Sequence, residues 1–130
     1  MGAWGTGPFD NDDASDWVYG LEDGGISTVE SALSEALEAS DLKGPTDRNA
    51  IAAGEVVAAA LGHPRAALTE SVLELAAGLE GSVTADHVAR ARSAAERVLS
   101  GSELADLWGE SGDAAEWRAS VHDLIRRLAV

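Results

Sequence analysis

Apolar residues recur every three or four positions along almost the whole chain, and this spacing constrains the fold more than any other feature. Such spacing predicts helices that each bury one face. No stretch shows the alternation of apolar and polar residues that predicts a half-buried strand. Alanine, the strongest helix former, supplies about a fifth of the chain. The sequence therefore predicts an all-α protein.

Glycines, prolines and helix-capping residues divide this pattern into about six or seven helices. The expected helices cover approximately residues 12–21, 27–39, 47–61, 68–79, 84–99, 104–108 and 113–128. The chain has 130 residues, of which 45% are hydrophobic and 25% charged, and these values are typical of one folded domain. We expect a single compact bundle over residues 1–130, with residues 1–11 as a non-helical opening segment packed against it.

Local patterns predict how two of the helices begin and which face of the fifth helix points outward. Ser27 and Glu30 have the spacing of a capping box at the start of the second helix, and Thr84 is suited to cap the fifth. On the fifth helix, Arg90, Arg92 and Arg97 fall outside the apolar stripe, so all three are expected to remain outside.

The third expected helix, residues 47–61, is apolar nearly all round, which predicts a place in the middle of the bundle. Between Asn49 and Gly62 its only charged residue is Glu55. A buried carboxylate must find a partner, turn outward or shift its pKa upward. We predict that Glu55 forms a structural hydrogen bond that ties the opening segment to this helix. A binding or catalytic role and simple exposure are the alternatives.

The opening segment has an unusual composition, with three glycines, two aromatic residues and a proline among its first nine positions. Gly5 and Gly7 allow a folded-back path. Trp4 and Phe9 are large apolar anchors suited to pin the segment to the bundle, or, for Trp4, to contact a partner. Trp17, on the apolar face of the first helix, is expected in the core.

A cluster of acids follows the glycines. Asn11 or Asp12 is placed to cap the first helix, and Asp12, Asp13 and Asp16 lie in or near its first turn, where the helix dipole favours negative charge. Read from Asp10, the cluster lacks the later ligands and the central glycine of an EF-hand loop. Capping and solvation are the expected roles, with an irregular Mg²⁺ site as the alternative. We expect no metal and no cofactor.

Two stretches of the sequence resemble a known family. Residues 1–17 read MGAWGTGPFDNDDASDW, and residues 50–64 read AIAAGEVVAAALGHP. They resemble the two blocks, M-G-[AT]-W-G-x-G-x-F-x-[ND]-D-x-A-x-[DE]-[WH] and A-x-A-A-A-E-[VI]-[VI]-A-A-x-x-G-x-P, of an uncharacterised domain-of-unknown-function family of small, mostly bacterial proteins. The resemblance implies an all-helical fold and carries no assigned activity. Gly54 stands where that family more usually has alanine, which suggests a close contact there.

Charge is unevenly distributed along the chain, whose formal net charge is -14. Residues 1–43 contain ten acids and one base, whereas residues 88–130 contain seven acids and six bases. The first third would repel nucleic acid and anionic lipid and would attract a basic protein or a divalent cation. A solubilising surface is the simplest interpretation of this charge. The chain has no cysteine, no apolar run long enough to span a membrane and no visible secretory signal, so we expect a cytoplasmic protein.

No catalytic motif emerges from the sequence. The Gly5-Thr6-Gly7 turn lacks the lysine and the spacing of a phosphate-binding loop, and the three histidines lie in different elements. The leading hypothesis is a non-enzymatic protein-interaction module with a basic partner, for example an immunity or antitoxin-like protein that neutralises a basic toxin. The alternative is an enzyme or a small-ligand or metal-binding protein, with a pocket between the opening segment and the third helix that uses Glu55 with Asp12 or Asp13. A third possibility is a purely structural or oligomerising module, which an exposed apolar patch at Trp4 or Trp108 would favour.

Overall fold

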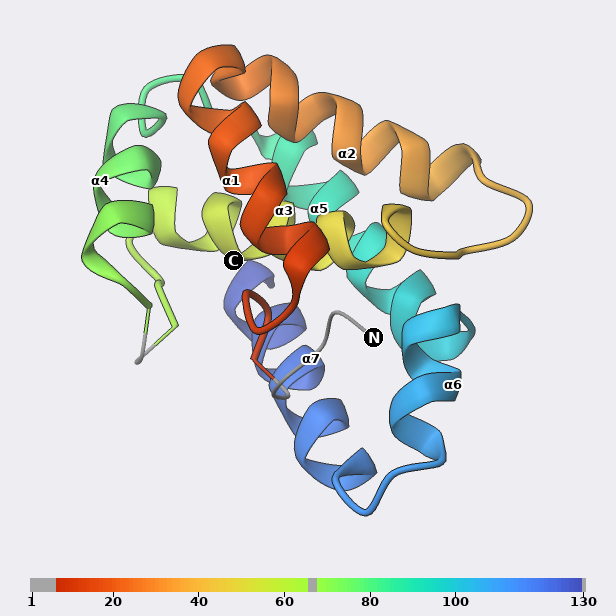
Figure 1. Cartoon of the computed structure of the whole chain (residues 1–130). Coiled ribbons are helices and arrows are strands. Elements are labelled where there is room, and N and C mark those ends of the chain that lie inside the picture. Colours follow the sequence, from red (N-terminus) through yellow and green to blue (C-terminus); the bar gives the residue numbers. More distant parts are fainter. Residues whose placement is uncertain (1–6, 66–67, 130) are drawn as a thin grey trace.

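The computed structural model describes residues 7–65 and 68–129, and all regular structure in these residues is helical (Figure 1). The described residues form seven helices and no strand: α1 (Asp12–Gly24), α2 (Ile26–Glu38), α3 (Thr46–Ala60), α4 (Glu70–Gly78), α5 (Ala85–Ser100), α6 (Glu103–Gly109) and α7 (Ala114–Leu128). The prediction of a compact all-α fold with six or seven helices is confirmed.

Helix α3 lies at the centre of the bundle and contacts all six other helices. Every residue from Ala50 to Ala58 is buried, as the lack of a polar face predicts. Small side chains let neighbouring helices approach closely. A Cβ atom added to Gly54 would lie 3.1 Å from Cδ2 of Leu124 on α7, so the close contact expected at this glycine is confirmed.

Helices α1 and α2 meet at a sharp corner, where Gly25 adopts a φ of 57°. The capping box predicted for α2 is wrong, because this helix begins at Ile26 with Gly25 as its N-cap and no side-chain cap. Thr28 instead donates its hydroxyl to the carbonyl oxygen of Gly20 at 3.1 Å, across the corner. A Cβ atom on Gly24 would overlap that hydroxyl, so this glycine permits the approach.

Backbone hydrogen bonds cap the C-terminus of α3, and Thr84 caps the N-terminus of α5 as predicted. The amide of Gly62, at a φ of 89°, donates to Ala59 at 3.0 Å, and the amide of His63 donates to Ala58 at 2.9 Å. This pair of bonds is a Schellman motif. Thr84 caps α5 and, together with His87, forms a reciprocal capping box.

Arg97 on α5 is the clearest departure from the predicted outer face. Its guanidinium donates to the carbonyl oxygens of Ala36 and Ala39, at the C-terminal end of α2. The last carbonyls of a helix have no partner within the helix, and a long arginine side chain can reach them while its stem stays packed. Arg97 therefore links α5 to α2.

The apolar stripe of α7 is buried in the core and consists of Trp117, Val121, Leu124 and Leu128. Trp17 on α1 is only 9% exposed and belongs to the same core. Within residues 7–65 and 68–129, no helix combines the length and the hydropathy that crossing a membrane requires.

Candidate functional site

The described part of the opening segment, residues 7–11, is non-helical and folds back on itself just before α1. The amide of Gly7 donates to Oδ2 of Asp10 at 3.1 Å, and a Cβ on Gly7 would lie only 2.6 Å from that oxygen. Pro8 is buried and Phe9 packs against the core. These contacts hold the end of the segment on the bundle. The predicted site residues Trp4 and Gly5 lie outside the described residues.

Asn11 connects this turn to α1. Its side chain is 5% exposed, and Oδ1 accepts a hydrogen bond from the amide of Ala14 at 2.8 Å. The other end of the same amide group, Nδ2, donates to the carbonyl oxygen of Pro8 at 3.4 Å. Of the two candidate caps, Asn11 and Asp12, the structure therefore uses Asn11. Burial and capping together explain an asparagine here, since a carboxylate could not donate to Pro8.

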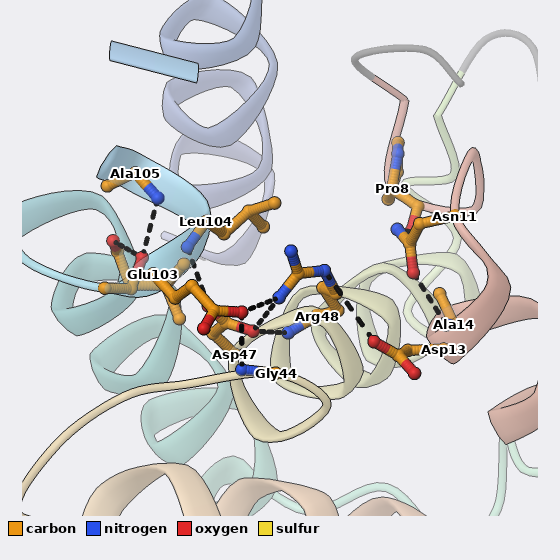
Figure 2. A network of polar contacts seen from close by, with 12 residues as sticks. Pro8, Asn11, Asp13, Ala14, Gly44, Asp47, Arg48, Glu103, Leu104 and Ala105 are labelled. Carbon is orange, nitrogen blue, oxygen red and sulfur yellow. Dashed lines mark hydrogen bonds and ion pairs between the residues drawn. The ribbon is translucent and has the colours of Figure 1, made fainter. Parts of the chain in front are cut away.

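Arg48 on α3 is the centre of a polar network that joins three helices (Figure 2). Its Nη1 donates to Oδ1 of Asp47 and to Oε1 of Glu103 on α6, both at 3.0 Å. Its Nε lies 3.7 Å from Oδ2 of Asp13 on α1. One guanidinium therefore faces three carboxylates, and the network binds α1, α3 and α6 together.

Asp47 has a second structural role at the start of α6. It is 0% exposed, and its Oδ2 accepts a hydrogen bond from the amide of Leu104 at 2.8 Å. Burial raises the pKa of Asp47 above its ordinary value of 3.8, against the lowering effect of the hydrogen bonds from Leu104 and Arg48. Asp47 thus satisfies one of the free amides in the first turn of a short helix.

Glu103 lies on the solvent-exposed side of this network. Its Oε1 accepts from Arg48 and, at 3.2 Å, from the amide of Gly44 in the loop before α3. These hydrogen bonds lower the pKa of Glu103 below its ordinary value of 4.5. The sequence interpretation missed the network, because nothing in the sequence places residue 103 beside residue 48.

Glu55 is buried, with 1% of its surface exposed, and its partner is Arg127 on α7. The Arg127 guanidinium donates to Oε1 at 2.9 Å and to Oε2 at 3.0 Å, so the pair is bidentate. The same guanidinium donates to Oδ2 of Asp123 at 2.8 Å and to the carbonyl oxygen of His63 at 3.2 Å. Although burial opposes its charge, Glu55 and Asp123 raise the pKa of Arg127 above its ordinary value.

The prediction for Glu55 is therefore corrected in one respect, which is the element that its carboxylate bonds to. Simple exposure is excluded, and in the described residues the carboxylate bonds to the last helix, not to the opening segment. In the described part of the opening segment, the amide of Gly7 donates to Asp10. A charge partner was required, but its identity depends on how α3 and α7 pack, which the sequence pattern does not specify.

A small cavity lies where the opening segment meets α3, α6 and α7, close to the position predicted for a pocket. Its volume is about 10 Å³, which is room for a single water molecule. Arg48 and Asn11 line its polar side, and Ile51 and Trp117 are among its apolar walls. Trp108 also lines it and is partly buried. Glu55 does not line this cavity.

The remaining acids of the predicted cluster do not converge. Asp12 and Asp16 are exposed on α1, and Asp13 faces Arg48, whereas Glu55 faces Arg127. The pairing of Glu55 with Asp12 or Asp13 that the alternative function requires is not formed. Over the part of the chain that the structure describes, no three acidic or histidine side chains come together as a metal site would require.

Comparison with known proteins identifies a family without assigning an activity. Residues 2–120 match the model of the family described as "Domain of unknown function (DUF4259)". Because this match covers most of the chain, the protein belongs to that family. Neither a curated protein nor a solved structure matches the chain.

Proposed function

We propose that this member of the DUF4259 family is a non-enzymatic interaction module that binds a basic protein through the outer faces of α1 and α2. The observation that carries the proposal is the charge of these two helices, which together contain eight acidic residues and no basic residue. Six of the eight are exposed and form no ion pair with any described residue: Asp12, Asp16, Glu22, Asp23, Glu35 and Glu38.

The other two acids of α1 and α2 and both acids of α3 face basic or histidine side chains. Asp13 and Asp47 face Arg48, Glu55 faces Arg127, and Glu30 lies 2.7 Å from His87. The six exposed acids without an ion pair have no such role in the described fold. Uncompensated charge of one sign on adjacent helices steers an oppositely charged partner and speeds association. A basic protein is thus the kind of partner that this surface favours.

An immunity or antitoxin-like role, in which the module neutralises a basic toxin such as a nuclease, is one concrete form of this proposal. Its support is the acidity of the surface. The same proposal places the protein in the cytoplasm, with the lack of cysteine as support. The alternative of a small-ligand site beside the opening segment draws no support from a cavity of about 10 Å³.

The proposal is tested by affinity capture from the native host with a C-terminal tag, so that the opening segment stays free. The test variant carries Asp12→Asn, Asp16→Asn, Glu22→Gln and Glu38→Gln. The control variant carries the same number of neutralised, exposed acids on other helices: Glu70→Gln, Glu74→Gln, Glu96→Gln and Glu116→Gln. We expect a stoichiometric basic partner with the wild type and the control and its loss with the test variant. Equal capture by both variants would refute the proposed surface.

A further inference from the structure

A second hollow lies on the surface between α1 and α2, on the proposed interaction face. The two helices diverge from the corner at Gly25, and in Figure 1 α3 passes behind α1 and below α2. The hollow has a volume of about 290 Å³, at the lower end of the range for ligand pockets and suited to a single side chain. Its lining consists of Trp17 from α1, Ser27, Thr28, Ser31, Ala32 and Glu35 from α2, and Asn49 from α3.

Asn49, one of the lining residues, has a side-chain oxygen that accepts no hydrogen bond. Its Oδ1 is the one buried side-chain polar atom among the described residues that has no hydrogen-bond partner. Buried polar atoms nearly always have a partner, so an orphaned one points to a donor that is missing from the isolated chain. Asn49 lines the hollow, and the last torsion of an asparagine side chain is two-fold and broad, so the amide can rotate to present its oxygen to a ligand.

The rest of the lining also offers acceptors. Glu35 is exposed and pairs with no basic side chain in the described residues. Ser27, Ser31 and Glu35 are spaced four residues apart, so they lie along one face of α2. Trp17 adds an aromatic wall, and aromatic walls are frequent partners of guanidinium and ammonium groups. Acceptors, a carboxylate and an aromatic ring together form the chemistry that receives a cationic hydrogen-bond donor.

We propose that this hollow is the anchor site for one arginine side chain of the basic partner, held by the Glu35 carboxylate and the Asn49 amide oxygen against Trp17. This inference rests on the proposed function and specifies where the partner is held. Arginine fits better than lysine, because five N–H donors in a planar fork can reach acceptors from two helices at once. The surrounding charge supports the assignment, since neither α1 nor α2 contains a basic residue.

The test is an NMR titration of the ¹⁵N-labelled full-length protein with the blocked tripeptide acetyl-Gly-Arg-Gly-amide. The same peptide with citrulline, which keeps the shape of arginine without its charge, is the matched control. We expect saturable shifts of the Asn49 side-chain amide and the Trp17 indole N–H with the arginine peptide only. Equal shifts with citrulline, or shifts spread over the acidic surface without saturation, would overturn the inference.

Single variants then distinguish binding of the peptide in the hollow from general electrostatic attraction to the acidic surface. We expect Asn49→Ala to weaken binding of the arginine peptide about tenfold, and Glu35→Gln about threefold. Glu38→Gln removes the same charge from α2 outside the hollow and should leave the affinity within about twofold. Thermal unfolding of each variant shows that it remains folded. Equal effects of Glu35→Gln and Glu38→Gln would contradict an anchor at this position.

The captured partner distinguishes failure of the anchor from failure of the proposed function. If the partner binds the wild type and Asn49→Ala equally well, the interaction module stands and the anchor is wrong. If the arginine peptide binds in the hollow but no basic protein is captured, the anchor stands as a guanidinium site and the proposed function is wrong.

Discussion

The carboxylate of Glu55 on α3 and the guanidinium of Arg127 on α7 form a bidentate ion pair, with N–O distances of 2.9 and 3.0 Å. Both side chains are largely buried, and the pair joins the central helix to the last helix of the bundle. Removing one member of such a pair leaves an uncompensated charge inside the protein, which costs far more than the net contribution of the intact pair.

We therefore expect Arg127→Met to lower the free energy of unfolding by about 3–5 kcal/mol, measured by urea denaturation. Adding Glu55→Leu should recover part of this loss, because the double variant no longer buries a lone carboxylate. The matched control is Arg126→Met, since Arg126 is 76% exposed, and it should cost at most about 1 kcal/mol. Equal losses for Arg126→Met and Arg127→Met would contradict a structural role for the pair.

The cap of α1 gives a second prediction. Asn11 accepts from the Ala14 amide and is buried, so Asn11→Ala should destabilise the protein by about 1–2 kcal/mol in a urea melt. Asp12→Asn alters the neighbouring exposed acid and should change the stability by less than about 0.5 kcal/mol. If Asp12→Asn proved the more damaging change, the cap would be assigned to the wrong residue.

The pH dependence of stability tests the network around Arg48. Because burial raises the pKa of Asp47 in the folded state, its contribution is fully present below the unfolded value of 3.8 and is lost as the pH rises through the folded value. Asn at this position stays neutral. The stability of the wild type relative to Asp47→Asn should therefore fall as the pH rises above 3.8, in urea melts at a series of pH values.

Glu103 should show the opposite sign in the same experiment. Its pKa is lowered in the folded state, so its contribution is present above the unfolded value of 4.5 and is lost as the pH falls through the folded value. The stability of the wild type relative to Glu103→Gln should rise with pH across this range. Two differences that run in the same direction would contradict the network as described.

Alanine substitutions at two helical glycines distinguish the effect of helix propensity on stability from the effect of packing. Gly20→Ala, on the exposed side of α1, adds a Cβ at an ordinary 3.9 Å from Thr28 and should stabilise the protein by about 0.5–1 kcal/mol. Gly54→Ala adds a Cβ at 3.1 Å from the fully buried Leu124. Because overpacking costs about 1–3 kcal/mol, Gly54→Ala should be the less stable of the two. A larger gain at Gly54 would show that Leu124 has room to move.

The fold was predictable from the sequence because its determinants are local. The apolar spacing, the glycine breaks and the all-apolar segment around Glu55 predict where the helices lie and that α3 is central. Errors arose where tertiary contacts decide the outcome. Thr28 bonds across the corner to Gly20 instead of capping α2, and Arg97 reaches the end of α2 instead of solvent.

The candidate site was less predictable for the same reason. Burial of Glu55 and capping by Asn11 follow from the pattern of the chain itself. The partners of Glu55 and Arg48 do not, because residues 127 and 103 reach them only after α6 and α7 have packed. Charge counting identified the acidic first third, but the hollow beside Asn49 needed the positions of α1, α2 and α3 together.

The most direct test of the central claim is the salt dependence of binding between the purified protein and its captured partner. An acidic face that attracts a basic protein predicts that affinity falls steeply as the salt concentration rises from about 0.05 M to about 0.5 M. The variant neutralised at Asp12, Asp16, Glu22 and Glu38 should bind more weakly at low salt and respond less to added salt. Affinity that is unchanged by salt, and equal for the wild type and this variant, would contradict the account.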